Sequence, residues 1–263
     1  MRRTVLLSAL VAVAVLATPA AGAPATTPAV GVYLVRHGCV APVRRVAADG
    51  ATLRGALDAL LRGPTAVERR AGYGTAVPAG TQLLGVTLLN GVATVDLSPR
   101  FGTGGDRAST PMRVAQVVDT VTQFPEARRV AFRIQGRIAR TVGAGVVTWP
   151  PLRRRDVEAQ DPPILVEQPL PGDLVTRRIS VAGTADVFEA RLVVELRTTG
   201  GAVLARRLVS ATSGSGVRGS FSVRVAVPVT AELAGAVVAA YARSPKDGRP
   251  IDVVRVPVRI APG

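Results

Sequence analysis

The chain has very few of the side chains on which most enzymes rely. Its 263 residues include one histidine, His37, and one cysteine, Cys39, and aromatic residues make up 3% of the total. A single histidine excludes a multi-histidine zinc site and leaves Ser-His-Asp or Cys-His catalysis only through His37. A single cysteine excludes an intramolecular disulfide. Because free cysteines usually pack as small hydrophobes, we expect Cys39 to be buried and inert.

Charge is strongly unbalanced toward the positive. The formal net charge is +15, and Lys246 is the only lysine among 33 basic residues. Such a field attracts anionic neighbours, so envelope polyanions and acidic lipid head groups are candidate partners. Nucleic acid is not expected, because aromatic residues for base stacking are scarce. The arginines are scattered, with no run longer than Arg153-Arg154-Arg155, so ordinary solvation of the surface is the competing interpretation.

The first 23 residues have the order of a secretory signal peptide. Arg2-Arg3 precedes an apolar run over residues 5–17, and the small residues Ala21-Gly22-Ala23 follow. We therefore expect cleavage near Ala23 and a secreted, extracytoplasmic mature chain. No later segment approaches the roughly 20 uninterrupted apolar residues of a transmembrane helix.

Residues 24–142 alternate between helix and strand patterns. The predicted elements are strands at 30–36, 82–89, 92–97 and 130–135 and helices at 51–62 and 111–124. Gly63-Pro64 ends the first helix, and Asn90-Gly91 favours a type I′ turn between two strands. This order predicts an α+β domain with two main helices on a small mixed or antiparallel sheet.

The pattern changes after residue 142. Periodicity disappears over residues 143–162, where Pro150-Pro151 and the arginine run predict an extended, semi-rigid linker. Trp149 either docks this linker onto one domain or stays exposed for a partner. From residue 163 to 263 apolar residues recur with period two. About seven short strands in about 100 residues predict an immunoglobulin-like sandwich without a disulfide. Pro257 donates no ladder hydrogen bond, so the last strand should lie at an edge or a bulge.

Two series of motifs resemble domains of bacterial spore germination proteins. The first series is Leu60-Leu61-Arg62-Gly63-Pro64-Thr65, Val77-Pro78-Ala79-Gly80-Thr81, Asn90-Gly91-Val92-Ala93-Thr94 and Ala115-Gln116-Val117-Val118-Asp119. It resembles the GerMN domain of sporulation and germination. The second is Pro169-Leu170-Pro171-Gly172, Val181-Ala182-Gly183-Thr184-Ala185 and Ser244-Pro245-Lys246-Asp247-Gly248. It resembles the immunoglobulin-like domain that accompanies GerMN modules. The resemblance implies an α+β fold similar to ring-building envelope modules, and no catalytic constellation.

One segment resembles an enzyme. Val32-Tyr33-Leu34-Val35-Arg36-His37-Gly38 is similar to the opening of the histidine phosphatase superfamily, in which the histidine becomes phosphorylated. That chemistry needs a second histidine, which the chain lacks. Gly102-Thr103-Gly104-Gly105 lacks the lysine of a Walker loop.

The carboxylates also give no catalytic pattern. Asp96, Asp106, Asp119 and Glu126 lie on separate predicted elements, and the sequence does not show whether any two converge. We therefore predict no catalytic, cofactor-binding or metal-ligating residue.

The leading hypothesis is a secreted, non-enzymatic envelope protein that acts by protein interaction or assembly, with envelope proteins or its own copies as partners. A role in sporulation or germination follows from the resemblance. The alternatives are a binding module for anionic cell-wall polymer and, less favoured because of the single histidine, an enzyme similar to the histidine phosphatases.

Export is testable directly. Mass spectrometry of the cultured medium should find a mature N-terminus at Pro24 or within a few residues of it, because the small residues at 21–23 suit signal peptidase. An intact Met1 on the secreted protein would contradict the signal peptide.

Overall fold

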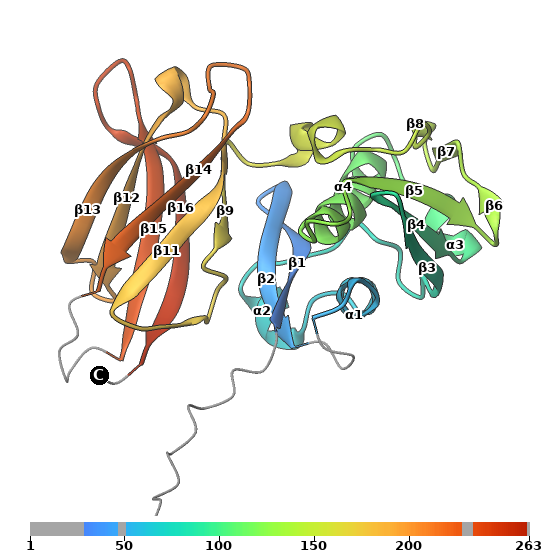
Figure 1. Cartoon of the computed structure of the whole chain (residues 1–263), viewed down its shortest axis with the longest axis horizontal. Helices are drawn as coiled ribbons and strands as arrows, with labels where there is room; N and C mark the ends of the chain where they lie inside the picture. The colour runs from blue at the N-terminus through green and yellow to red at the C-terminus, as the bar shows by residue number, and fades with distance from the viewer. Residues whose placement is uncertain (1–28, 47–50, 228–233, 262–263) are drawn as a thin grey trace, which may run out of the picture.

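The computed structural model describes residues 29–46, 51–227 and 234–261, and it confirms the predicted fold class. An α+β domain lies beside a strand-rich immunoglobulin-like domain (Figure 1). Each has its own cluster of buried apolar side chains. The predicted signal peptide, residues 1–23, lies outside the described residues.

The first domain has a hairpin, two longer helices and a mixed sheet. Its elements are β1 (Ala29–Arg36), β2 (Cys39–Val46), α1 (Leu53–Leu61), α2 (Ala66–Arg70), β3 (Leu83–Leu89), β4 (Val92–Leu97), α3 (Pro99–Gly102), α4 (Ser109–Thr122), β5 (Arg129–Ile134), β6 (Arg137–Ile138), β7 (Thr141–Val142) and β8 (Val146–Val147). The sheet order is β3-β4-β5-β6, with β4 and β5 parallel. Asn90 and Gly91 both have positive φ, 50° and 78°, as the predicted type I′ turn requires.

Helix α4 is buried on nearly every side, because it lies between the β1-β2 hairpin and the sheet (Figure 1). Its apolar side chains enter the core, and its polar side chains bond the free backbone edge of β1. Gln116 Nε2 donates to Tyr33 O at 2.9 Å, and Thr120 Oγ1 accepts from Tyr33 N at 3.1 Å. Gln123 accepts from Gly31 N and donates to Gly31 O, at 2.9 and 2.7 Å. Spaced at i, i+4 and i+7, these three side chains take the place of a neighbouring strand.

The segment predicted as a linker, residues 143–162, is folded onto the first domain. Beyond β8 it forms two 3₁₀ turns, η1 (Arg154–Asp156) and η2 (Glu158–Gln160). Leu152 and Val130 exchange two backbone hydrogen bonds of 2.8 Å, and Val157 is buried in the first core. The expectation of one extended stretch was therefore wrong here, because these apolar residues and the pairing with β5 hold the segment in place.

The second domain packs two sheets face to face. Its elements are β9 (Ile164–Gln168), β10 (Leu174–Val175), β11 (Arg178–Ala185), η3 (Phe188–Ala190), β12 (Arg191–Thr198), β13 (Val203–Ser210), β14 (Gly219–Ala226), β15 (Gly235–Arg243) and β16 (Pro250–Ile260). One sheet has the order β14-β11-β9 and the other β10-β16-β15-β12-β13. Alternate residues of the long strands point into the shared core, as the period of two predicted.

Strand β9 joins the two domains. It is the edge strand of its sheet on the side that faces β2 (Figure 1). Ile164 and Val166 pack in the sandwich core, whereas Leu165 between them packs in the core of the first domain. On its other side, β9 approaches β11 so closely that a Cβ on Gly183 would lie 1.9 Å from Leu165 O. Glycine at position 183 thus permits the close backbone approach that seats β9.

The bonds of Gln116 predict a large cost on its removal. Gln116 Oε1 also accepts a hydrogen bond from Ala76 N at 2.7 Å. The substitution Gln116→Leu therefore leaves both Tyr33 O and Ala76 N without these hydrogen-bond partners in a buried site. We expect the free energy of unfolding to fall by roughly 2–5 kcal/mol in urea denaturation. Gln82→Leu, at an exposed position, should change it by less than about 0.5 kcal/mol. Equal effects of the two substitutions would contradict the role given to Gln116.

Candidate functional site

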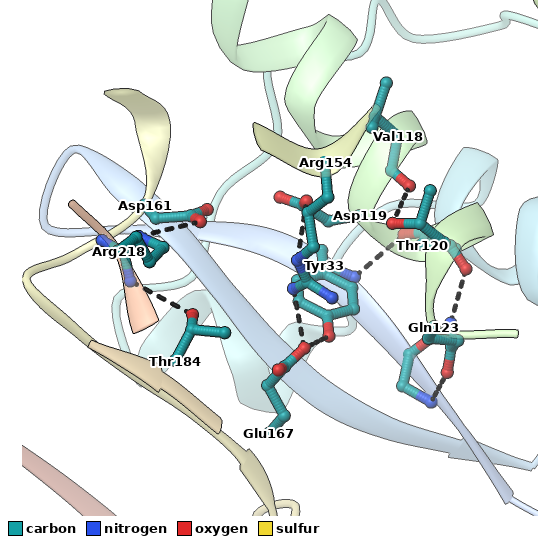
Figure 2. A network of polar contacts seen from close by, with 12 residues as sticks. Tyr33, Val118, Asp119, Thr120, Gln123, Arg154, Asp161, Glu167, Thr184 and Arg218 are labelled. Carbon is teal, nitrogen blue, oxygen red and sulfur yellow. Dashed lines mark hydrogen bonds and ion pairs between the residues drawn. The ribbon is translucent and has the colours of Figure 1, made fainter. Parts of the chain in front are cut away.

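The densest group of ionisable side chains that we find in the described residues lies between the two domains (Figure 2). At its centre is Arg154, on η1. Arg154 Nη2 lies 2.7 Å from Glu167 Oε1 on β9, and Arg154 Nε lies 3.4 Å from Asp119 Oδ1 on α4. The guanidinium carbon is 5.0 Å from the centre of the Tyr33 ring, a cation–π distance. The Tyr33 hydroxyl donates to Glu167.

Two buried carboxyl groups complete this cluster. The side chain of Asp119 has no exposed surface, and Asp161 follows η2 with its side chain equally covered. The carboxyl oxygens of this carboxyl pair are buried and have no hydrogen-bond partner among the described residues, although each carboxyl group lies near an arginine. Burial raises the pKa of Asp119 well above its ordinary value and the pKa of Asp161 to about 6. Two neighbouring buried carboxylates also repel each other, which favours the protonated form of one of them.

A second arginine ties the pair to the sandwich. Arg218, just before β14, lies with its Nε 3.7 Å from Asp161 Oδ2. Its Nη1 donates to Thr184 Oγ1 at 3.2 Å and its Nη2 to Pro162 O at 2.7 Å. With one carboxyl of the pair protonated, two arginines face two carboxylates, so the buried charges balance. The cluster therefore binds β1, α4 and the segment after β8 to the second domain.

Two clefts flank the interface between the domains. The first, of about 440 Å³, lies among the β1-β2 turn, Tyr73, β9 and residues 252–256 of β16. The second, of about 880 Å³, is more polar and borders the cluster at Tyr33, Arg154 and Glu167. The Arg154 and Glu167 side chains keep 23% of their surface exposed there, whereas Asp119 lies behind them. The carboxyl pair is thus closed off from this second cleft.

His37, the candidate of the phosphatase hypothesis, sits on an exposed turn. His37 and Gly38 form the two-residue connection between β1 and β2, with φ of 52° and 78°. Cys39, which we expected to be buried, is half-buried instead and lines the first cleft. Burial raises the pKa of its thiol, which lowers the reactive thiolate fraction. Trp149 is 37% exposed.

The glycine-rich loop is organised around a buried arginine. Arg113 of α4 donates to Phe101 O, Thr103 O and Gly104 O at 2.8, 3.0 and 3.2 Å. The loop thus turns carbonyl oxygens toward a cation, the reverse of a phosphate cradle, whose backbone N–H groups face the ligand. The contacts with Arg113 thus account for the conformation of this loop.

The carboxylates named from the sequence do not gather in one place. Asp96 Oδ1 accepts from Gly136 N at 3.0 Å, and Asp106 Oδ1 accepts from Ser109 N at 2.7 Å before α4. Asp119 does meet other carboxylates, but these are Asp161 and Glu167, which sequence reasoning passed over. The one available signal was the polar stripe of α4, since nothing local separates Arg154 from its arginine neighbours.

Across residues 29–46, 51–227 and 234–261, no group of three or more His, Cys, Asp or Glu side chains has the arrangement to hold a metal ion. None of the helices in these ranges is both long enough and apolar enough to cross a membrane.

Comparison with known families identifies both domains. Residues 31–139 match the family described as sporulation and spore germination, and residues 163–249 match the immunoglobulin-like domain of bacterial spore germination. The chain therefore carries a GerMN domain followed by a germination-type immunoglobulin-like domain, as the resemblance implied.

Solved structures of the same kind are distant in sequence. The first GerMN domain of the sporulation protein GerM from Bacillus subtilis is 24% identical, with a TM-score of 0.43, and the match covers 49% of this chain and all of that one. The tandem GerMN domains of the same protein are 17% identical, with a TM-score of 0.42, and cover 76% of this chain and 62% of that one. No curated protein matches the chain.

The carboxyl pair makes stability depend on pH. Because burial raises the pKa of Asp161 from 3.8 to about 6 in the folded state, folding takes up a proton between these values. The stabilisation from this proton is present below about pH 4 and lost as pH rises to about 6, and it amounts to at most about 3 kcal/mol. Between pH 4 and 7, the free energy of unfolding should therefore fall less in Asp161→Asn than in the unchanged protein, as measured by denaturation at each pH.

Asp247→Asn, at an exposed turn, provides the matched control and should follow the unchanged protein. If Asp161→Asn loses as much stability over this range as the control does, Asp161 does not take up a proton on folding.

Proposed function

We propose that this protein is a secreted, non-enzymatic component of the cell envelope that acts by contacts with other proteins or with its own copies. The observation that carries the proposal is the use of the buried ionisable cluster. Arg154, in the segment folded onto the first domain, pairs with Asp119 of that domain and with Glu167 of the second domain, so the cluster serves to hold two germination domains in one arrangement. Partners would then bind the outer surface of the two domains held in this arrangement.

Exposed apolar residues on an edge strand support a protein partner. Strand β3 is the outermost strand of its sheet and leaves Leu84, Leu88 and Leu89 exposed by 49, 41 and 72%. Unpaired edges with apolar side chains are suited to pairing with another chain. The matched families are described as sporulation and spore germination domains, which supports a role for the proposed contacts in those processes where the organism forms spores.

Binding of anionic wall polymer is the second candidate, favoured by the arginines that line the second cleft. These are Arg44, Arg154, Arg178 and Arg259. Three of them already have partners: Arg44 Nε lies 3.0 Å from Asp173 Oδ1, Arg154 contacts Glu167, and Arg259 Nε donates to Gly172 O at 3.0 Å. A site whose arginines are mostly paired already should bind a polyanion weakly, so protein contact is the better-supported function.

A salt series separates these two functions. The tagged mature chain, incubated with native envelope extract and cross-linked, should retain a defined protein partner, or its own copies, between about 0.1 and 1 M salt, where the Debye length falls from about 10 to 3 Å. Co-sedimentation with purified wall material is measured alongside. Arg178→Ser, which removes a cleft arginine, is expected to leave partner capture unchanged.

The opposite pattern would replace the proposal with polymer binding. That pattern is a strictly monomeric protein in light scattering, no recovered partner, and wall binding that is lost at moderate salt and weakened by Arg178→Ser.

A further inference from the structure

Strand β16 has an open backbone edge inside the first cleft. Its partner on that side, β10, pairs only with Arg259 and Ile260, and Gly172 N then donates to Pro257 O at 2.8 Å. Bonds along a strand alternate between its two sides, so the N–H and C=O groups of Arg255 and Val253 point the same way as the carbonyl of Pro257 and the N–H of Arg259. Among the described residues, none of the four groups of Arg255 and Val253 has a hydrogen-bond partner on that side.

The open edge of β16 lies within the first cleft. The cleft holds about 440 Å³, within the range of sites that enclose a ligand. Residues 164–166 of β9 and residues of the β1-β2 turn of the first domain also line this cleft. Pro171 lies at one end. At the other end Asp252 has a φ of 54°, and the pairing with β15 shifts register, so the straight run ends. The open run suits a strand of about four residues.

The charges around this edge select the occupant. Arg36 and Arg255 line the cleft, and neither has an ion pair within the described residues. The Nε of Arg36 is buried and has no hydrogen-bond partner there, and its guanidinium lies 5.0 Å from the Tyr73 ring centre. Asp252 is the one carboxylate in the lining. Two cations against one anion favour a segment that brings carboxylates.

We propose that this edge binds an acidic, extended peptide segment of a partner protein, which adds as a short strand beside Val253 and Arg255 of β16. Backbone hydrogen bonds supply the affinity, and Arg36 and Arg255 supply the preference for acidic side chains. The proposal rests on the protein-interaction function above, and it names one surface and the chemistry of its partner. Both domains contribute to the site, which therefore exists only while the interface is closed.

A defined probe tests the site without knowledge of the natural partner. The mature chain, labelled with ¹⁵N, is titrated with the capped hexapeptide Thr-Val-Glu-Val-Glu-Thr and with its counterpart carrying lysine in place of glutamate. We expect amide shifts centred on residues 253–255 and slower hydrogen exchange of the Arg255 amide. The acidic peptide should bind about tenfold or more tightly than the basic one.

Variants at one position separate backbone pairing from charge. Arg255→Ala removes the charge and keeps the N–H, whereas Arg255→Pro removes both. The strand already contains a proline two residues further on, Pro257, at a position whose N–H would also point away from β15. We expect Arg255→Pro to bind the acidic peptide about tenfold more weakly than Arg255→Ala, since it loses a backbone bond and blocks the strand. Arg224→Ala, on the exposed face of β14, is the remote charge control and should bind as the unchanged protein does.

Several results would overturn the proposal. These are equal affinity of Arg255→Pro and Arg255→Ala, equal binding of the acidic and basic peptides, or an Arg255 amide that exchanges as fast with the acidic peptide as without it. The last measurement uses the unchanged protein, so it decides even where Arg255→Pro fails to fold. Concentration-dependent self-association that Arg255→Pro abolishes would assign the edge to a second copy of this chain instead.

The envelope capture described above keeps the two proposals distinct. If Arg255→Pro still captures the same partner and the peptide does not bind, the edge assignment fails and the protein-interaction function stands. If no form of the chain captures a partner, the proposed protein-interaction function fails. The peptide titration still tests whether the β16 edge binds an acidic strand.

Discussion

The buried contacts of Arg154 hold the two domains in their observed relation. Removing a guanidinium from water is unfavourable unless carboxylates and aromatic faces replace the lost hydration. Here Glu167 of the second domain and Asp119 and Tyr33 of the first supply both. Because Arg154, Asp119 and Tyr33 all lie in the first domain and the segment folded onto it, the pairing that requires the domains to meet is the one between Arg154 and Glu167 of β9. Leu165 adds apolar contact at the same junction, since it packs in the first core.

The same constraint explains why helix α4 is buried on its polar side. An amphipathic helix normally turns its polar face to water. In this chain Gln116 and Thr120 bond the backbone edge of β1, and Asp119 faces Arg154. The hairpin therefore needs no third strand, and its far side is free to meet β9. One helix thus satisfies an exposed strand edge and contributes to the domain interface.

Local pattern was enough to predict most elements and too little to predict the contacts between them. The turn at Asn90-Gly91, both longer helices and the strands of the sandwich follow from periodicity and turn chemistry, which act over neighbouring residues. Strand β2 was missed because His37-Gly38 was considered as a phosphatase motif, although both residues have the positive φ of a hairpin turn. The role of Arg154 depends on partners 35 positions before and 13 after it, which no local pattern encodes.

The closed junction and the open edge of β16 have a common origin. Because β9 turns Leu165 toward the first domain, the β1-β2 turn comes to face the side of the sandwich where β10 is too short to cover β16. The sandwich alone would present this edge to solvent, where association with any strand is possible. The neighbouring domain narrows the access and places Arg36 beside it. Docking of the two domains thus converts a general sheet edge into a surface that selects by shape and charge.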